Sequence, residues 1–458
     1  MLNINKRFFT ENKVFIVSLS LFALILFLAV SAQAAEIEPP EVDYQSFKLE
    51  NGLEVLVFPD HSVPSLRFSM YYKVGAVDEP VGQTGISHFL EHIMFLGTKN
   101  LPEGEIDDLI SSVGGQLNAA TSYDYTYYYY ELPSSKLELA MALEADRMSN
   151  LKFNPEEINR EREVIKQERR MRTENNIFAR GFEKIKAKAF KDSYLEHSVI
   201  GWMEDINSIK AEELKNYYEQ YYSPNNALLV VSGDVKTAEV KTLAKKYYSS
   251  YQPQNIERKK FEIPEQNKEE TYKVHLKTNI PYALQLYKIP PADNFEIAAL
   301  EIFFDILANN QSSRLKEKLK KEKGIIIDAG AFVYPMRTES FALAYFIPAS
   351  PDLVEKSQTA YDKELKRIFN EGITREEFQI VKKQYQKSLI FSQKDINSTA
   401  STYALNKLRF NDADLLKEKI KYINQLSREE VVNIAQKYLS NDKRTRGYIL
   451  PKAEGGAE

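Results

Sequence analysis

The chain has 458 residues, of which 43% are hydrophobic and 28% are charged, and its net charge is −4. This length exceeds what one hydrophobic core supports, so we expect two or more domains, and the overall charge gives no indication of binding to nucleic acid or an anionic membrane. The absence of cysteine excludes disulfides, thiolate metal sites and cysteine nucleophiles. The chain has only five histidines: His61, His88, His92, His197 and His275.

Residues 1–34 are typical of a secretion signal. Basic residues at positions 6, 7 and 13 precede an apolar run over 14–30, and Ala32-Gln33-Ala34 supplies an A-x-A cleavage pattern. The alternative is an uncleaved membrane anchor, but the apolar run is slightly short for a span. We therefore predict a signal peptide over 1–34, a periplasmic or secreted protein, and no stable membrane anchor after cleavage.

Strands are expected at the start of the mature chain. Residues 47–49 and 53–58 flank an Asn-Gly pair, which is a hairpin signal, and residues 66–74 follow as a third strand. Residues 116–132 are rich in tyrosine and threonine, which favours strand over helix.

Residues 84–97 are predicted to form the central helix of this half. Thr84 is a candidate N-cap and Gly97 a candidate stop. One stripe of the helix is apolar: Ile86, Phe89, Leu90, Ile93 and Met94. Helices are also expected at 105–113, at 137–148, and from Asn154 onward, where an Asn-Pro-Glu-Glu sequence starts a long charged helix.

His88, Glu91 and His92 form a second stripe on the central helix, because residues three or four apart are neighbours there. Two imidazoles one turn apart can bind one metal ion, with a carboxylate beside them. This H-x-x-E-H order is the inverse of H-E-x-x-H and is typical of a class of zinc peptidases. Glu91 is the natural general base, since a carboxylate beside zinc can take a proton from metal-bound water.

A catalytic zinc site usually has three protein ligands, so a third is needed. Spacing alone leaves several candidates: His61, His197, His275, or an acidic residue of the helix over 154–173. On that helix Glu161 and Glu168 are seven positions apart and share a face with apolar side chains. They are therefore better inward candidates than Glu163.

The second half repeats the order of elements of the first. Positions 207–223 align with positions 424–440 in one constant register, and each segment is a helix leading into a strand. This repetition predicts duplication of one α+β domain. The expected fold class is α+β, with two homologous lobes, each a mostly antiparallel sheet packed with helices.

Domain boundaries follow from composition. A polar, proline-rich and charge-rich stretch begins near residue 248 and indicates a linker. We predict an N-terminal catalytic zinc lobe over 35–250, a linker over 251–272 and a C-terminal lobe without metal over 273–458.

Taken together, these motifs resemble the pitrilysin/insulinase-type zinc peptidases, specifically the short bacterial members related to the mitochondrial processing peptidase. The resemblance covers essentially all of residues 44–452. It rests on matching stretches at 49–53, 74–79, 88–92, 114–119, 161–168, 199–202 and 222–226.

This resemblance implies roles for individual residues. His88 and His92 match the zinc ligands, Glu91 the catalytic base, and Glu168 the third ligand. Glu161 matches a second acidic position that supports the active site. Asn118 and Ala119 match an edge strand that pairs with the substrate backbone. Family members form two related α+β lobes, and two such chains, or one double-length chain, close into a chamber around unfolded peptides.

The second half departs from the family pattern. Active relatives carry an Arg and a Tyr, seven positions apart, that bind the substrate carbonyl, but the matching positions here are Lys320 and Ile327. Isoleucine cannot donate a hydrogen bond, so this half lacks the oxyanion contact. We therefore expect a heterodimer with a related subunit that carries the Arg/Tyr pair, a homodimer being the alternative, and no nucleic-acid partner.

The resulting prediction is a zinc-dependent endopeptidase with one Zn²⁺ per chain that hydrolyses small unfolded polypeptides, with Glu91 activating a zinc-bound water. The alternative is a non-catalytic assembly subunit or a peptide-binding protein of the same family.

Overall fold

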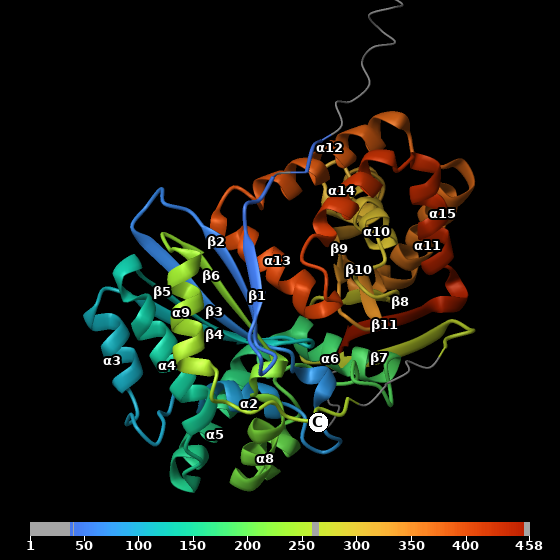
Figure 1. Cartoon of the computed structure of the whole chain (residues 1–458). Helices are drawn as coiled ribbons and strands as arrows, with labels where there is room; N and C mark the ends of the chain where they lie inside the picture. Colours follow the sequence, from blue (N-terminus) through green and yellow to red (C-terminus); the bar gives the residue numbers. More distant parts are fainter. Residues whose placement is uncertain (1–36, 40, 259–264, 453–458) are drawn as a thin grey trace, which may run out of the picture. The chain divides into compact units, whose positions relative to one another are not determined.

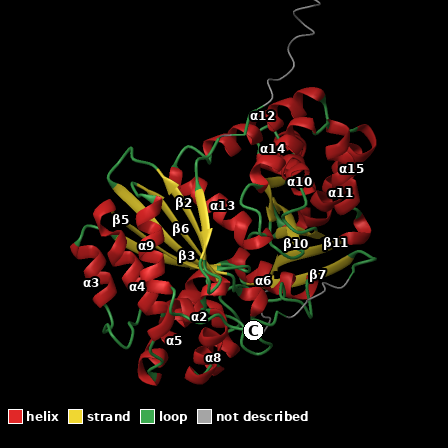
Figure 2. Cartoon of the chain, viewed as in Figure 1, coloured by secondary structure: helices red, strands yellow, loops and turns green. Residues whose placement is uncertain are grey.

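A computed structural model describes residues 37–39, 41–258 and 265–452, and the predicted signal peptide lies outside these residues. Two separate sheets organise the described chain (Figures 1 and 2). The first sheet has the order β1-β2-β6-β3-β5-β4 and the second the order β7-β11-β8-β10-β9. Only the pairs β2–β6 and β7–β11 are parallel. The expected α+β class and mostly antiparallel sheets are confirmed.

The strands of the first sheet are β1 (Gln45–Lys48), β2 (Glu54–Pro59), β3 (Ser65–Tyr72), β4 (Gln116–Thr121), β5 (Thr126–Pro133) and β6 (Ala227–Gly233). Those of the second are β7 (Glu270–Leu276), β8 (Tyr282–Ile289), β9 (Ile326–Tyr334), β10 (Ser340–Pro348) and β11 (Arg444–Pro451). The predicted hairpin between β1 and β2 is present. The tyrosine-rich run over 116–132 is two strands and not one, because a turn after Thr121 pairs β4 with β5.

The α-helices that follow the strands of the first sheet are α2 (Ile86–Ile93), α3 (Glu105–Ser112), α4 (Leu137–Asn150), α5 (Pro155–Arg169), α6 (Ile177–Ala189), α7 (Met203–Ser208), α8 (Ala211–Tyr221) and α9 (Thr237–Tyr248). Those of the second half are α10 (Glu296–Phe304), α11 (Val354–Glu371), α12 (Arg375–Phe391), α13 (Ile396–Phe410), α14 (Leu415–Gln425) and α15 (Arg428–Tyr438). Two further helical segments of the second half are wider π-helical turns, at Asp305–Asn309 and Lys316–Glu322.

The internal repeat is confirmed and extends beyond the segment that shows it in the sequence. The register that aligns Ala211 at the start of α8 with Arg428 at the start of α15 also aligns the ends of these two helices. The same register aligns β3 with β8 at both ends, and the start of β6 with the start of β11. The two sheets therefore have the same topology, apart from the extra edge strand β1.

The two halves exchange one helix each. Helix α6 packs against β7, β8 and β11 of the second sheet, whereas α13 packs against β2 and β6 of the first. Small residues allow the α6 contact, because a Cβ on Gly181 or Gly447 would lie within 2.5 Å of an isoleucine of the opposing element. Because α6 and α13 each pack against the sheet of the other half, the structure does not divide the two halves at one point in the sequence. The lobe boundaries proposed from composition therefore stay a prediction.

The core of the first half lies between its sheet and its helices. Phe89, Leu90 and Ile93 of α2 are fully buried in the same apolar cluster as Phe68 and Tyr128 of the sheet. Each such side chain contributes about 1.5–3 kcal/mol of hydrophobic free energy when buried. This packing fixes the apolar face of α2 against the sheet and leaves its polar face without a packing partner in the core. No helix among the described residues is long and apolar enough to cross a membrane.

Candidate metal centre and active site

Helix α2 begins differently from the prediction. Thr84 is not its N-cap: its hydroxyl donates to Asp205 at 2.6 Å and accepts from the backbone N–H of Trp202. Gly85 occupies the cap position with φ 86°, a left-handed conformation that favours glycine. The side chain of Glu79 accepts hydrogen bonds from the buried N–H groups of Gly85 at 2.7 Å and Ser87 at 3.0 Å. These are N–H groups at the start of the helix that have no partner within it.

The three polar residues of the H-x-x-E-H motif line one pocket of about 850 Å³. The imidazoles of His88 and His92 lie edge to face, with ring centroids 4.7 Å apart. The apolar stripe of α2 is buried behind them, so the motif side chains face the pocket.

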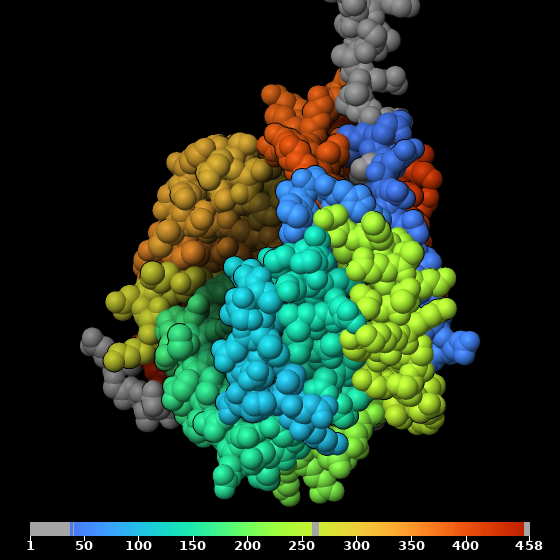
Figure 3. Space-filling model, turned by 60° about the vertical axis from the view of Figure 1, so that its left-hand side comes forward, coloured from blue at the N-terminus to red at the C-terminus, as the bar shows by residue number. Residues whose placement is uncertain are grey.

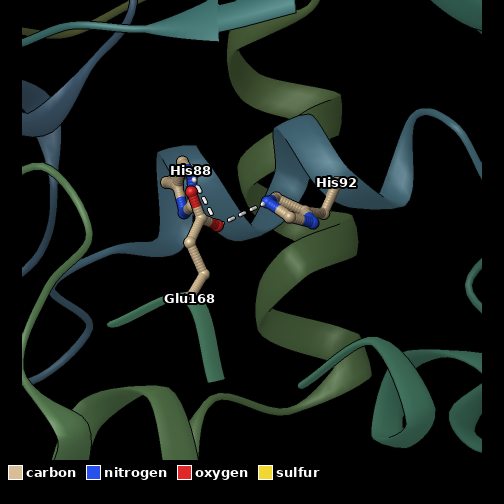
Figure 4. A group of neighbouring side chains, drawn as sticks. All are labelled: His88, His92 and Glu168. Atoms are coloured by element: carbon tan, nitrogen blue, oxygen red, sulfur yellow. Dashed lines mark ion pairs between the residues drawn. The ribbon is translucent and has the colours of Figure 1, made fainter. Parts of the chain in front are cut away.

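Glu168, at the end of α5, reaches the same point (Figure 4). Its Oε2 atom lies 3.6 Å from His88 Nε2 and 3.3 Å from His92 Nε2. One ligand atom from each of the three residues lies within 4.8 Å of the others, and no other group of this kind occurs in the described part of the chain. Glu168 Oε2 is buried and accepts no hydrogen bond.

This arrangement fits a zinc ion. Zinc takes imidazole nitrogen and carboxylate oxygen ligands, and catalytic sites commonly use three protein ligands. A buried carboxylate oxygen without a donor is costly unless a cation or a hydrogen bond compensates it. The convergence of two Nε2 atoms on that oxygen provides the place for such a cation.

Two neighbouring side chains orient these ligands. Glu161 Oε1 lies 2.7 Å from His92 Nδ1, which directs the Nε2 atom of the same ring toward Glu168. Arg172 Nε contacts the other oxygen of Glu168 at 2.9 Å. Arg172 follows α5 on a π-helical turn over Arg170–Glu174, and its i,i+4 spacing from Glu168 is the sequence signal that could have indicated this contact.

Electrostatics separate the two histidines. Burial and the neighbouring His92 lower the pKa of His88 to about 4, so this imidazole is neutral. Burial also disfavours the charged form of His92, but the hydrogen bond to Glu161 and the nearby carboxylate of Glu168 outweigh it and raise the pKa of His92 to about 9. Burial works against the charge of Glu168 as well, yet its contacts with His92 and His88 hold the pKa of Glu168 below its ordinary value. Of the two histidines, His92 is therefore the one that is protonated at neutral pH when no cation is bound.

Glu91 lies on the same side of α2 and contacts the sheet. Its Oε2 atom accepts a hydrogen bond from the hydroxyl of Thr121, the last residue of β4. Burial raises the pKa of Glu91 above its ordinary value, and the Thr121 hydrogen bond opposes this rise only in part. Sequence reasoning misses Thr121, because nothing in the spacing joins residues 91 and 121.

Strand β4 forms one wall of the pocket. It is an edge strand of the first sheet, so its outer backbone groups have no strand partner among the described residues. Asn118 and Ala119, which the resemblance assigns to substrate binding, lie on β4 and line the pocket.

The remaining predicted candidates lie elsewhere. His61 pairs with Asp234 at 2.6 Å on the surface, His275 lies in β7, and His197 is buried with its ring 3.6 Å from Glu79. Glu163 faces solvent and pairs with Lys166. In the second half, Ile327 is 46% exposed on the edge strand β9, and Lys320 lies 3.5 Å from Asp328.

Comparison with known families finds two adjacent matches. Residues 55–202 match the model described as insulinase (peptidase family M16), and residues 208–385 match the peptidase M16 inactive domain. Together they cover more than two thirds of the chain.

Curated relatives and solved structures agree with these matches. The chain is 28% identical to the zinc protease PqqE of Helicobacter pylori, over 93% of this chain and 97% of the relative. It is 25% identical to the uncharacterized zinc protease YmxG of Bacillus subtilis, over 86% of this chain and 96% of the relative. The crystal structure of a protease from Helicobacter pylori superposes with a TM-score of 0.84 at 27% identity, covering 90% of this chain and all (100%) of that one.

A structure of the periplasmic protease PqqL from Escherichia coli shares the fold, with a TM-score of 0.75 at 20% identity over 91% of this chain and 48% of that one. The chain therefore belongs to the pitrilysin/insulinase-type (M16) family, whose short bacterial members include zinc proteases.

Proposed function

We propose that the protein is a zinc-dependent endopeptidase that cleaves small, unfolded polypeptides. The observation that carries the proposal is the convergence of His88, His92 and Glu168 on one point of a pocket that also holds Glu91. The names of the relatives support a peptidase of the zinc-dependent kind.

The three ligand atoms would hold one zinc ion per chain, which would act as a Lewis acid and lower the pKa of a water molecule at the site. Glu91 takes the proton of the attacking water. Its Oε2 atom is engaged by Thr121, which leaves Oε1 to receive that proton, and burial raises the pKa of this carboxyl group above its ordinary value, which makes it a stronger base. Glu161 keeps the His92 ring in the orientation that binding requires.

The substrate backbone would pair with β4 at Asn118 and Ala119. An extended peptide can add to an exposed sheet edge through main-chain hydrogen bonds, and only a flexible segment can adopt that conformation. This mode of binding accounts for the preference for unfolded polypeptides that we propose.

A second subunit would complete the site. Lys320 and Ile327 stand where active relatives carry Arg and Tyr, so this chain lacks the usual donors to the substrate carbonyl. We propose a heterodimer with a related subunit that has the pair, with a homodimer as the alternative. The A-x-A pattern after the apolar run supports export to the periplasm or the medium.

Lys320 and Ile327 also favour a second candidate function, a non-catalytic assembly subunit. Metal analysis combined with cleavage of an unstructured peptide separates the two functions. We expect wild type and Glu91→Gln to bind zinc equally, and cleavage to fall at least about a hundredfold in the variant. Glu163→Gln, an exposed site on α5, is the matched control.

Each protein is assayed alone and with the related subunit. Zinc binding without cleavage under either condition would support the assembly subunit. A protein that binds no zinc would support a peptide-binding role.

A further inference from the structure

Helix α12 presents an apolar and basic surface that no described element covers. Three of the ten exposed large hydrophobic side chains of the described chain lie on it: Ile380 is 49% exposed, Ile390 37% and Phe391 46%. Lysines stand between them along the same side of the helix. We call this surface the α12 patch, comprising Ile380, Lys383, Lys387, Ile390, Phe391 and Lys394.

The α12 patch is positive although the whole chain is slightly negative. All charged residues from 378 to 394 are lysines. Lys387 and Lys394 lie 5.1 Å and 3.7 Å from the centre of the Phe391 ring. The next acidic residue, Asp395, is engaged elsewhere, because its carboxylate accepts two backbone N–H groups at the start of α13. Among the described residues, Lys383, Lys387 and Lys394 form no ion pair, so their ammonium groups remain available to an anionic surface.

The composition of the patch favours a lipid surface over a protein partner. Protein–protein interfaces are depleted in lysine. Helices that lie at the membrane–water interface instead combine lysines with Phe and aliphatic side chains. A lysine stem can lie along an apolar surface while its ammonium group reaches outward. A phenylalanine ring flanked by two ammonium groups matches the boundary between acyl chains and anionic headgroups.

The lead-in to β1 lies close to the α12 patch. The hydroxyl of Tyr44 donates to Asp414 at 3.0 Å, immediately before α14, and α14 packs against α12. The residues that lead into β1 thus enter the fold beside this helix pair. The orange helix α12 lies next to this blue segment at the top of Figure 1, and orange and blue atoms lie side by side at the top of the space-filling view in Figure 3.

We propose that the α12 patch docks the protein reversibly onto an anionic phospholipid bilayer, with Phe391 entering the headgroup boundary and Lys383, Lys387 and Lys394 contacting lipid phosphates. This inference does not depend on peptide cleavage. It differs from anchoring by a membrane span, because one aromatic side chain and a few lysines give weak, salt-sensitive binding.

Co-sedimentation with vesicles tests the proposal. The protein is the chain from Ala35, since residues from Pro39 onward cluster into one compact unit. We expect binding to vesicles of phosphatidylcholine with phosphatidylglycerol, little binding to phosphatidylcholine alone, and a loss of binding at high salt. Each Lys→Gln change at Lys387 or Lys394 should lower the partition coefficient about fivefold, and Phe391→Ser should lower it about tenfold.

Matched controls use exposed residues elsewhere: Lys241→Gln and Lys245→Gln on α9, and Val81→Ser at a side chain that is 96% exposed. Circular dichroism checks that each variant is folded. The proposal is overturned by equal binding to neutral and anionic vesicles, or by patch variants that bind as the wild type does. It is also overturned if wild type self-associates without lipid and Phe391→Ser abolishes that association, since the patch would then be a protein interface.

Discussion

The two sheets of this protein share one topology but differ in chemistry. Strand β3 aligns with β8, and helix α8 with α15, in a single register. The number of residues between the strand and the helix is therefore the same in both halves. The first helix after each of these strands differs. Helix α2 carries His88, Glu91 and His92 on one face, whereas α10 buries seven of its nine residues, all of them apolar.

This difference teaches that the fold does not need the metal-binding side chains. The second half forms a sheet of the same topology, with an apolar helix at the position of α2. Among the described residues, no group suited to bind a metal occurs outside the first half. We therefore expect changes at the site to remove chemistry while leaving stability nearly unchanged.

The largest effect is expected for His92→Ala. The variant loses one of three ligands and should bind zinc at least about a thousandfold more weakly. Because the His92 side chain is 21% exposed and outside the apolar core, the metal-free variant should remain folded, with a thermal midpoint lowered only by the loss of the His92 pairs with Glu161 and Glu168. Competition with a chromophoric chelator measures the affinity, and a metal-free variant that unfolds would show that the site also supports the fold.

The next largest effect is a gain of peptidase activity from two substitutions in the second half. Lys320→Arg combined with Ile327→Tyr restores two donors on partly exposed positions, so the fold should tolerate both changes. Peptide cleavage by the chain alone should rise about a hundredfold, the usual contribution of an oxyanion donor. Unchanged cleavage in a zinc-loaded, folded double variant would contradict the idea that these two positions limit activity.

A smaller effect is expected for Glu161→Gln. The glutamine holds the His92 ring less firmly, and zinc affinity should fall ten- to a hundredfold, roughly the cost of losing a partner that orients a metal ligand. Glu163→Gln on the same helix is the control, because Glu163 faces solvent. Equal zinc affinity in the two variants would remove Glu161 from the site.

The smallest effect concerns pH and a buried histidine outside the site. Burial lowers the pKa of His197 to about 4 from its ordinary 6.5. The unfolded chain then binds a proton below pH 6.5 that the folded chain does not, so the unfolding free energy decreases as pH falls from 6.5 toward 4. The slope from this residue is at most about 1.4 kcal/mol per pH unit. Urea unfolding of His197→Gln should show a shallower decline, and an identical decline would exclude the residue.

The sequence predicts the site better than it predicts its support. Helical periodicity brings His88, Glu91 and His92 together, and the resemblance selects Glu168, which spacing alone cannot do. The contact of Thr121 with Glu91 joins segments 30 residues apart and leaves no local pattern. Arg172 and Glu79 are close in sequence to the groups they contact, Glu168 and Gly85, but spacing alone does not distinguish them from other charged neighbours.

The expected cap of α2 is wrong for a related reason. Thr84 is of a residue type suited to an N-cap, but residue type says nothing about a competing partner. In the fold Asp205 accepts the Thr84 hydroxyl, and Gly85 takes the cap position in its place.

The fold was likewise predictable in part. The register of the repeat can be read from one helix and the strand after it, and it holds along both sheets. The exchange of α6 and α13 between the sheets could not be predicted, because amphipathic patterns show that a helix has a partner but not which one.

Anomalous X-ray scattering at the zinc edge, from crystals of the zinc-loaded wild-type protein, tests the central claim most directly. The account predicts one strong peak per chain, about 2.0–2.2 Å from His88 Nε2, His92 Nε2 and Glu168 Oε2. A peak at another place, or none at these three atoms in a protein saturated with zinc, would contradict it.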